Sequence, residues 1–130
     1  MIVQMTVKNF RKILPKICGK DTSFDPKGWD KENSFWGHSS VVSLLAQSLF
    51  GGKIYGVDLK GTQFAKMKFH LWNIFPNGKM KDFTRSQFGD EYPGELEIKQ
   101  VGAAILMDDK GTLRRFKLLQ ERFEAECKKK

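Results

Sequence analysis

The fold is decided by residues 36–52, which read WGHSSVVSLLAQSLFGG. Ser39 or Ser40 suits a helix N-cap, because a hydroxyl can accept a hydrogen bond from the free N–H groups of the first turn. Gly51-Gly52 suits the end of that helix, because glycine readily takes a left-handed conformation. Apolar residues at positions 41, 42, 44, 45 and 49 cover most of the helix surface and predict a buried helix.

A serine at the start of a buried helix has two interpretations. The helix dipole and the free N–H groups favour negative charge there, on a nucleophile or on a substrate oxygen. The same pattern is also typical of any capped helix in a protein core. The rest of the chain must decide between a reactive Ser39 and a structural one.

Composition indicates a single globular domain spanning residues 1–130, with 40% hydrophobic and 29% charged residues. We expect no membrane association, because the longest apolar run is short and is interrupted by Ser and Gln. The N-terminus lacks a signal-peptide pattern. Cys18 and Cys127 show no metal-ligand spacing, and we expect reduced thiols in a cytoplasmic protein.

A formal net charge of +8 raises nucleic acid as a partner. The lysines are scattered, however, and no nucleic-acid motif is present, so a solvated basic surface is the preferred interpretation. Two histidines and two distant cysteines predict no metal site. Gly51-Gly52 lacks the further glycines of a dinucleotide loop, so we expect no cofactor.

The order of predicted elements is helix, helix, strands, helix. Apolar spacing predicts a helix over 3–14 that ends near Pro15, and an amphipathic helix over 113–128 capped by Thr112. Strands are expected at 53–59 and 66–75, a returning strand at 79–84, and a short strand or extended segment at 100–107. The aromatic loop 19–38 should pack over the start of the helix at Ser39. This pattern predicts an α+β fold, with N-terminal helices packed on a small, mostly antiparallel sheet and an amphipathic C-terminal helix.

The register of the hairpin around Pro76-Asn77-Gly78 decides what His70 can touch. A two-residue loop would place residue 70 opposite 85, and Asp82 would point away from His70. A three-residue loop with a left-handed Gly78 would place residue 70 opposite 84. Asp82 would then be a diagonal neighbour of His70 on the same face. Pro at the first loop position and Gly at the third suit the three-residue form.

Several segments in order resemble the YunG-like family of small proteins. They are Gly37-His38-Ser39 before a helix, Gly51-Gly52, His70-Leu71-Trp72-Asn73, Pro76-Asn77-Gly78, Asp82-Phe83-Thr84 and Gln87-Phe88. The family pattern has a cysteine where this chain has Ser39, and it is similar in turn to transglutaminase-like and papain-like thiol enzymes. The resemblance implies Ser39 as nucleophile, His70 as base and Asp82 as orienting carboxylate, with Trp36, Trp72 and Asn73 lining or bracing the cleft.

The departure at position 39 leaves three alternatives. In the first, Ser39 is a natural serine nucleophile. In the second, the site has lost its activity and kept its binding, and in the third a cysteine has been replaced deliberately. The first functional hypothesis is therefore an acyl-transfer or amide-hydrolysis cleft, active or inactive. The second is a non-enzymatic domain that binds a peptide or another protein through the aromatic loop. A nucleic-acid binder ranks last, because it rests on charge alone.

Overall fold

The computed structural model describes residues 4–129 and shows an α+β architecture. The helices are α1 (Val7–Ile17), α2 (Ser39–Phe50), α3 (Ala103–Asp108) and α4 (Lys110–Cys127). The strands are β1 (Lys53–Asp58), β2 (Phe69–Ile74), β3 (Met80–Lys81) and β4 (Lys99–Val101). Three short 3₁₀ helices lie at Lys20–Thr22, Ala65–Met67 and Arg85–Phe88. The predicted fold class is confirmed.

The four strands form an antiparallel sheet in the order β3-β2-β1-β4. In the β2–β3 hairpin Asn73 lies opposite Lys81 and Ile74 opposite Met80. Gly78 has φ 84° and donates its N–H to the Phe75 carbonyl at 2.8 Å. This is the register of the three-residue loop, so the expected loop type is confirmed, although the pairing ends before residues 70 and 84 could face each other.

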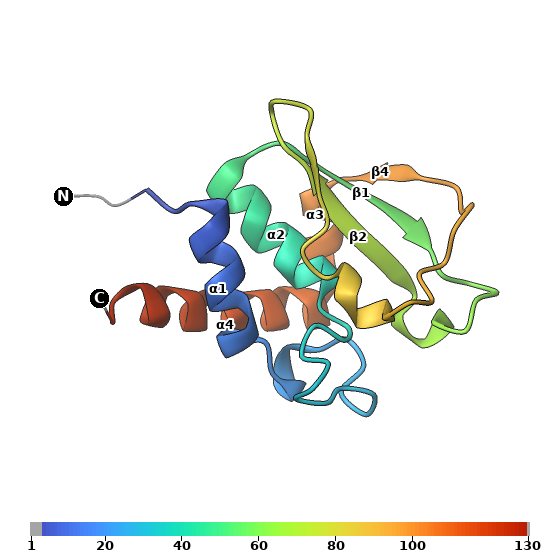
Figure 1. Ribbon diagram of the computed structural model, residues 1–130, viewed down its shortest axis with the longest axis horizontal. Coiled ribbons are helices and arrows are strands. Elements are labelled where there is room, and N and C mark those ends of the chain that lie inside the picture. The colour runs from blue at the N-terminus through green and yellow to red at the C-terminus, as the bar shows by residue number, and fades with distance from the viewer. Residues whose placement is uncertain (1–3, 130) are drawn as a thin grey trace.

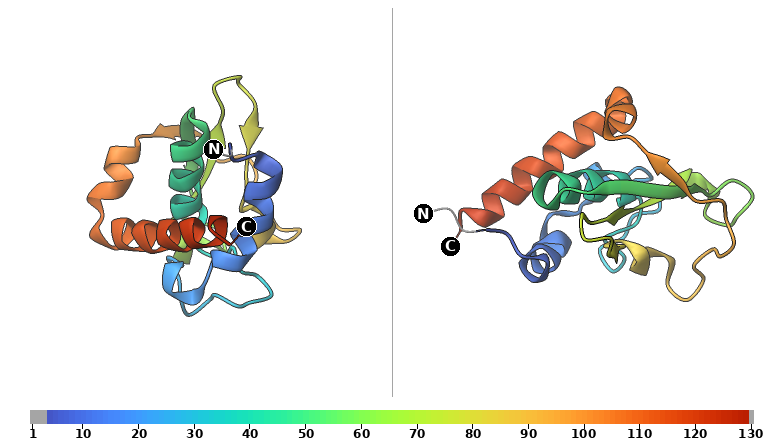
Figure 2. Two further views of the ribbon diagram at one scale, coloured as in Figure 1. Left: turned by 90° about the vertical axis from the view of Figure 1, so that its left-hand side faces the viewer. Right: turned by 90° about the horizontal axis from the view of Figure 1, so that it is seen from above.

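The helices and the sheet enclose two apolar clusters. The larger cluster joins α1, α2 and α4 to one face of the sheet, with Phe10, Leu45 and Leu119 among its fully buried members. The smaller cluster lies on the opposite face, around Trp72 and Phe88. Figure 1 shows α2 crossing between the other long helices and the strands, and Figure 2 shows α4 lying along one side of the molecule.

Helix α1 departs from its predicted boundary, because it continues through Pro15 to Ile17. Proline removes one helical hydrogen bond, but Ile17 is only 2% exposed, and the Cys18 N–H still bonds the Leu14 carbonyl at 3.1 Å. Burial of the last turn in the larger cluster thus offsets the bond that Pro15 cannot make.

The second half of the chain contains three further corrections. Residues 103–108 form α3 instead of an extended segment, and only 99–101 form a strand. Helix α4 begins at Lys110, with Asp109 as its N-cap in place of Thr112. The returning strand β3 is two residues long, so its pairing with β2 ends at Lys81. Residues 69–72 of β2 therefore have no β3 partner.

Candidate functional site

Ser39 is the first residue of α2 and lies against the free edge of β2. Its hydroxyl accepts a hydrogen bond from the Leu71 N–H at 3.1 Å and donates one to the Phe69 carbonyl at 3.5 Å. Because β3 pairs only with Asn73 and Ile74, this part of the β2 edge has no strand beside it. The Ser39 hydroxyl therefore takes the place of a strand partner. Ser39 or Ser40 was predicted to be the N-cap of α2, but His38 occupies that position.

His70 and Asp82 form a buried pair. The distance between His70 Nε2 and Asp82 Oδ2 is 2.6 Å, and the two side chains are 0% and 4% exposed. His70 Nδ1 and Asp82 Oδ1 are buried and have no hydrogen-bond partner among the described residues. The pairing predicted from the hairpin register is therefore present, and it leaves one imidazole nitrogen available.

Ser39 and the His70 imidazole are close in the fold but are not bonded to each other. The Ser39 hydroxyl contacts the backbone of the two residues that flank His70. Side chains alternate along a strand, so Leu71 packs in the larger cluster with α2, while His70 turns toward Trp72 and Phe88 on the other face. The structure thus joins His70 to Asp82 and places Ser39 against the backbone on either side of His70.

His38 is the other histidine, and both of its ring nitrogens are engaged. Nε2 lies 2.7 Å from the Thr22 hydroxyl, and Nδ1 lies 3.0 Å from the Trp36 carbonyl. Burial lowers the pKa of His38 from 6.5 to about 4, although its hydrogen bonds to the backbone oppose the shift. His38 is therefore a neutral structural residue near pH 7, and His70 is the histidine with an unused nitrogen within residues 4–129.

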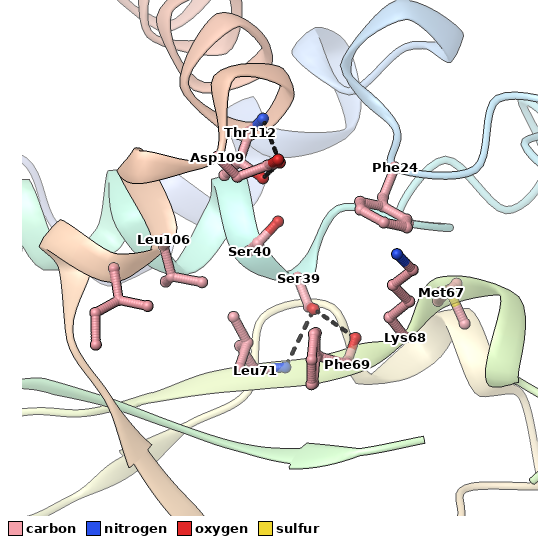
Figure 3. Close-up of a pocket in the computed structure, with 12 residues that line it drawn as sticks. Phe24, Ser39, Ser40, Met67, Lys68, Phe69, Leu71, Leu106, Asp109 and Thr112 are labelled. Carbon is pink, nitrogen blue, oxygen red and sulfur yellow. Dashed lines mark hydrogen bonds between the residues drawn. The ribbon is translucent and has the colours of Figure 1, made fainter. Parts of the chain in front are cut away.

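A pocket of about 340 Å³ opens beside Ser39 (Figure 3). Its walls come from the start of α2, the start of β2, the α3–α4 junction and Phe24 of the aromatic loop. Figure 3 shows Ser39 and Ser40 on one side and the Lys68 ammonium near the Phe24 ring, at 5.7 Å from its centroid. The predicted nucleophile position is thus reached by a real cavity.

Two charged residues of this pocket, Asp109 and Lys68, differ in how they are held. The Thr112 hydroxyl and N–H donate to Asp109 Oδ2 at 2.8 and 3.0 Å and lower the pKa of its carboxyl. Lys68 is exposed and has backbone angles φ 62°, ψ −52°, a strained γ-turn conformation for a residue with a side chain. Sequence reasoning missed Lys68 and Asp109, because no local pattern places them beside Ser39.

The residues predicted to line or brace the cleft lie elsewhere. The Trp36 indole N–H donates to Asp25 at 3.0 Å, and its ring packs against the smaller cluster. Trp72 is buried beside the His70 ring. The Asn73 amide donates to the Ser43 carbonyl in α2 at 3.0 Å. All three support the framework around the site and none is part of the pocket wall beside Ser39.

The model of the YunG protein family matches residues 6–128. The chain belongs to the YunG family. Comparison with curated proteins and with solved structures gives no significant match. Family membership supports the resemblance based on the ordered segments around Ser39, His70 and Asp82, and it assigns no activity to them.

Within residues 4–129 no helix has the length and apolar character needed to cross a membrane. The same part of the chain holds no cluster of three or more His, Cys, Asp or Glu side chains placed to bind a metal ion.

Proposed function

We propose that this YunG-family chain carries a Ser–His–Asp site for acyl transfer or amide hydrolysis, with Ser39 as nucleophile, His70 as base and Asp82 as orienting carboxylate. One observation carries the proposal: His70 binds Asp82 through Nε2 and keeps a buried, unpartnered Nδ1. In a catalytic triad the carboxylate holds one ring nitrogen, and the other takes the proton of the nucleophile.

The hydrogen bonds of Ser39 are compatible with that role. The hydroxyl donates to the Phe69 carbonyl over 3.5 Å, much longer than the usual 2.7–2.8 Å of an O–H···O bond. Its proton is therefore weakly held by that carbonyl, and the proposed reaction requires the hydroxyl to turn from the β2 backbone toward His70 Nδ1. On attack, Ser39 Oγ forms the bond to the acyl carbon, the proton passes to His70, and the leaving group departs with that proton.

The start of α2 supplies the electrostatic part of the site. The first-turn N–H groups of α2 have no acceptor within the helix, and its dipole is positive at this end. An acyl oxygen in the pocket beside Ser39 would develop negative charge near these groups. We expect slow turnover with serine, because the family pattern that the chain resembles has cysteine here, and a hydroxyl is a weaker nucleophile than a thiolate.

The test replaces Ser39 with cysteine and measures the pKa of the new thiol from its thiolate ultraviolet absorbance. Cys127→Ser removes the half-buried native thiol, and the buried Cys18 remains, because burial raises the pKa of its thiol. Ser40→Cys is the matched control, since it shares the helix end and the pocket. We expect a thiol pKa at least about two units below the ordinary 8.5 in Ser39→Cys, and a smaller shift in Ser40→Cys.

An additional Asp82→Asn substitution should bring the pKa of the Ser39→Cys thiol back toward the ordinary value, because the imidazolium that stabilises the thiolate loses its carboxylate. The proposal fails if Ser39→Cys and Ser40→Cys titrate alike.

A second candidate function is non-enzymatic binding. The observation that favours it is the burial of His70 and Asp82, which are 0% and 4% exposed. In that case the pair stabilises the sheet, the pocket beside Ser39 binds without chemistry, and Asp82→Asn leaves the thiol of Ser39→Cys unchanged.

A further inference from the structure

The pocket beside Ser39 continues into a second cavity of about 440 Å³. The two cavities share four lining residues: Phe69, Leu71, Ile105 and Leu106. The shared residues come from β2 and from α3, so the cavities form one groove between the sheet and α3, here called the α3 groove. Its combined size is in the range of sites that hold small organic ligands.

The α3 groove exposes large apolar side chains. Phe69 is 52% exposed and Ile105 is 71% exposed, although both line the two cavities. Helix α3 contributes no fully buried residue to the core. An apolar occupant would cover Phe69 and Ile105 and gain the hydrophobic free energy that the chain alone leaves unused.

The two ends of the groove differ in charge. At the Ser39 end lie the positive start of α2 and the exposed Lys68, while the ionised Asp109 carboxylate there accepts from Thr112 and has its charge paired with Arg115 at 3.8 Å. At the far end Lys99 and Glu97 pair with each other at 3.4 Å. An oxygen-rich, negatively charged head therefore suits the Ser39 end, and an apolar tail suits the remainder.

The floor of the groove favours an alkyl chain over a peptide. Gly56 lies opposite Leu71 of β2 on one side and Lys99 of β4 on the other, so β1 is paired along both edges from residue 54 to residue 56. The groove lies on the face of the sheet and offers side-chain contact instead of an open row of N–H and C=O groups. A bound peptide would leave its own backbone groups without such partners.

We propose that the α3 groove binds the alkyl chain of a fatty acid or fatty acyl ester, with the carboxyl carbon beside Ser39. This inference rests on the proposed function for the acyl ester, whereas binding of the free fatty acid is independent of it. Lys68 contributes attraction to the carboxylate, and Phe69 and Ile105 contact the chain.

The test is calorimetric titration of the wild-type chain with butanoate, hexanoate, octanoate and decanoate at equal ionic strength. Each step adds two methylenes, and we expect affinity to rise roughly tenfold per step until the groove is filled. Ile105→Asp should weaken decanoate binding at least about tenfold, because it places a charge against the tail. Ile98→Asp is the matched control, since Ile98 is 60% exposed and lines neither cavity.

Lys68→Gln should weaken all four acids by a similar factor, because it removes only the attraction to the head. Affinity that does not depend on chain length, or that falls equally in Ile105→Asp and Ile98→Asp, overturns the inference. Binding of an uncharged apolar peptide in the same groove without any fatty acid binding also overturns it. Decanoate binding together with an ordinary thiol pKa in Ser39→Cys would refute the proposed catalytic site and leave the groove as a binding site.

Discussion

The buried His38 should make folding stability depend on pH. Its pKa is lowered by burial from 6.5 to about 4 in the folded chain. Between these values the unfolded chain binds a proton that the native chain excludes, so stability is full above about pH 6.5 and is lost as the pH falls toward 4. Lowering the pH from about 7.5 to about 4.5 should remove about 2–3 kcal/mol of the free energy of unfolding through this residue.

His38→Gln isolates this contribution. A glutamine amide offers one donor for the Trp36 carbonyl and one acceptor for the Thr22 hydroxyl, the two groups that His38 contacts, and it does not titrate. Urea unfolding of both chains across the pH range gives the difference in the free energy of unfolding, in which carboxylates common to both cancel. The difference should shift by about 2–3 kcal/mol in favour of the variant as the pH falls. A difference that stays constant would refute the claim that burial keeps His38 neutral.

Two further predictions concern the pocket. Ser39→Ala should lower the free energy of unfolding by about 1–3 kcal/mol, because the Leu71 N–H loses its acceptor, whereas Ser40→Ala should change it by less than about 0.5 kcal/mol. Equal effects in urea unfolding would show that the Ser39 hydroxyl does not anchor α2 to β2. Lys68→Gly should raise the free energy of unfolding by about 1 kcal/mol, since relief of backbone strain exceeds the entropy cost of glycine. A loss of stability in thermal unfolding would contradict strain at position 68.

Local patterns were sufficient for part of the site. The apolar run before Gly51 predicted α2, and turn chemistry at Gly78 predicted the hairpin register, because both depend on residues close in sequence. The register and strand alternation also predicted Asp82 beside His70, and the two side chains do meet, although Asp82 lies just beyond the end of the ladder. These features depend on the conformational preferences of neighbouring residues, which can be read from the sequence.

The remainder depends on contacts between distant segments. The pocket beside Ser39 needs Phe24, Lys68 and Asp109 together, and no spacing rule connects them. The α3 segment was predicted to be a strand or extended, since short apolar runs are ambiguous between helix and strand. The hydrogen-bond partners of the Ser39 hydroxyl could not be predicted either, because they depend on the residue at which β3 stops pairing with β2.

The short length of β3 connects all parts of the candidate site. A strand that continued past Lys81 in the same register would pair with the Phe69–Leu71 edge of β2 and displace the Ser39 hydroxyl. Because pairing stops at Lys81, the start of α2 can reach that edge. Asp82, the next residue, turns its carboxylate to His70 instead of continuing the ladder. The early end of one strand therefore brings a hydroxyl, an imidazole and a carboxylate to a single stretch of β2, and the pocket opens beside the hydroxyl.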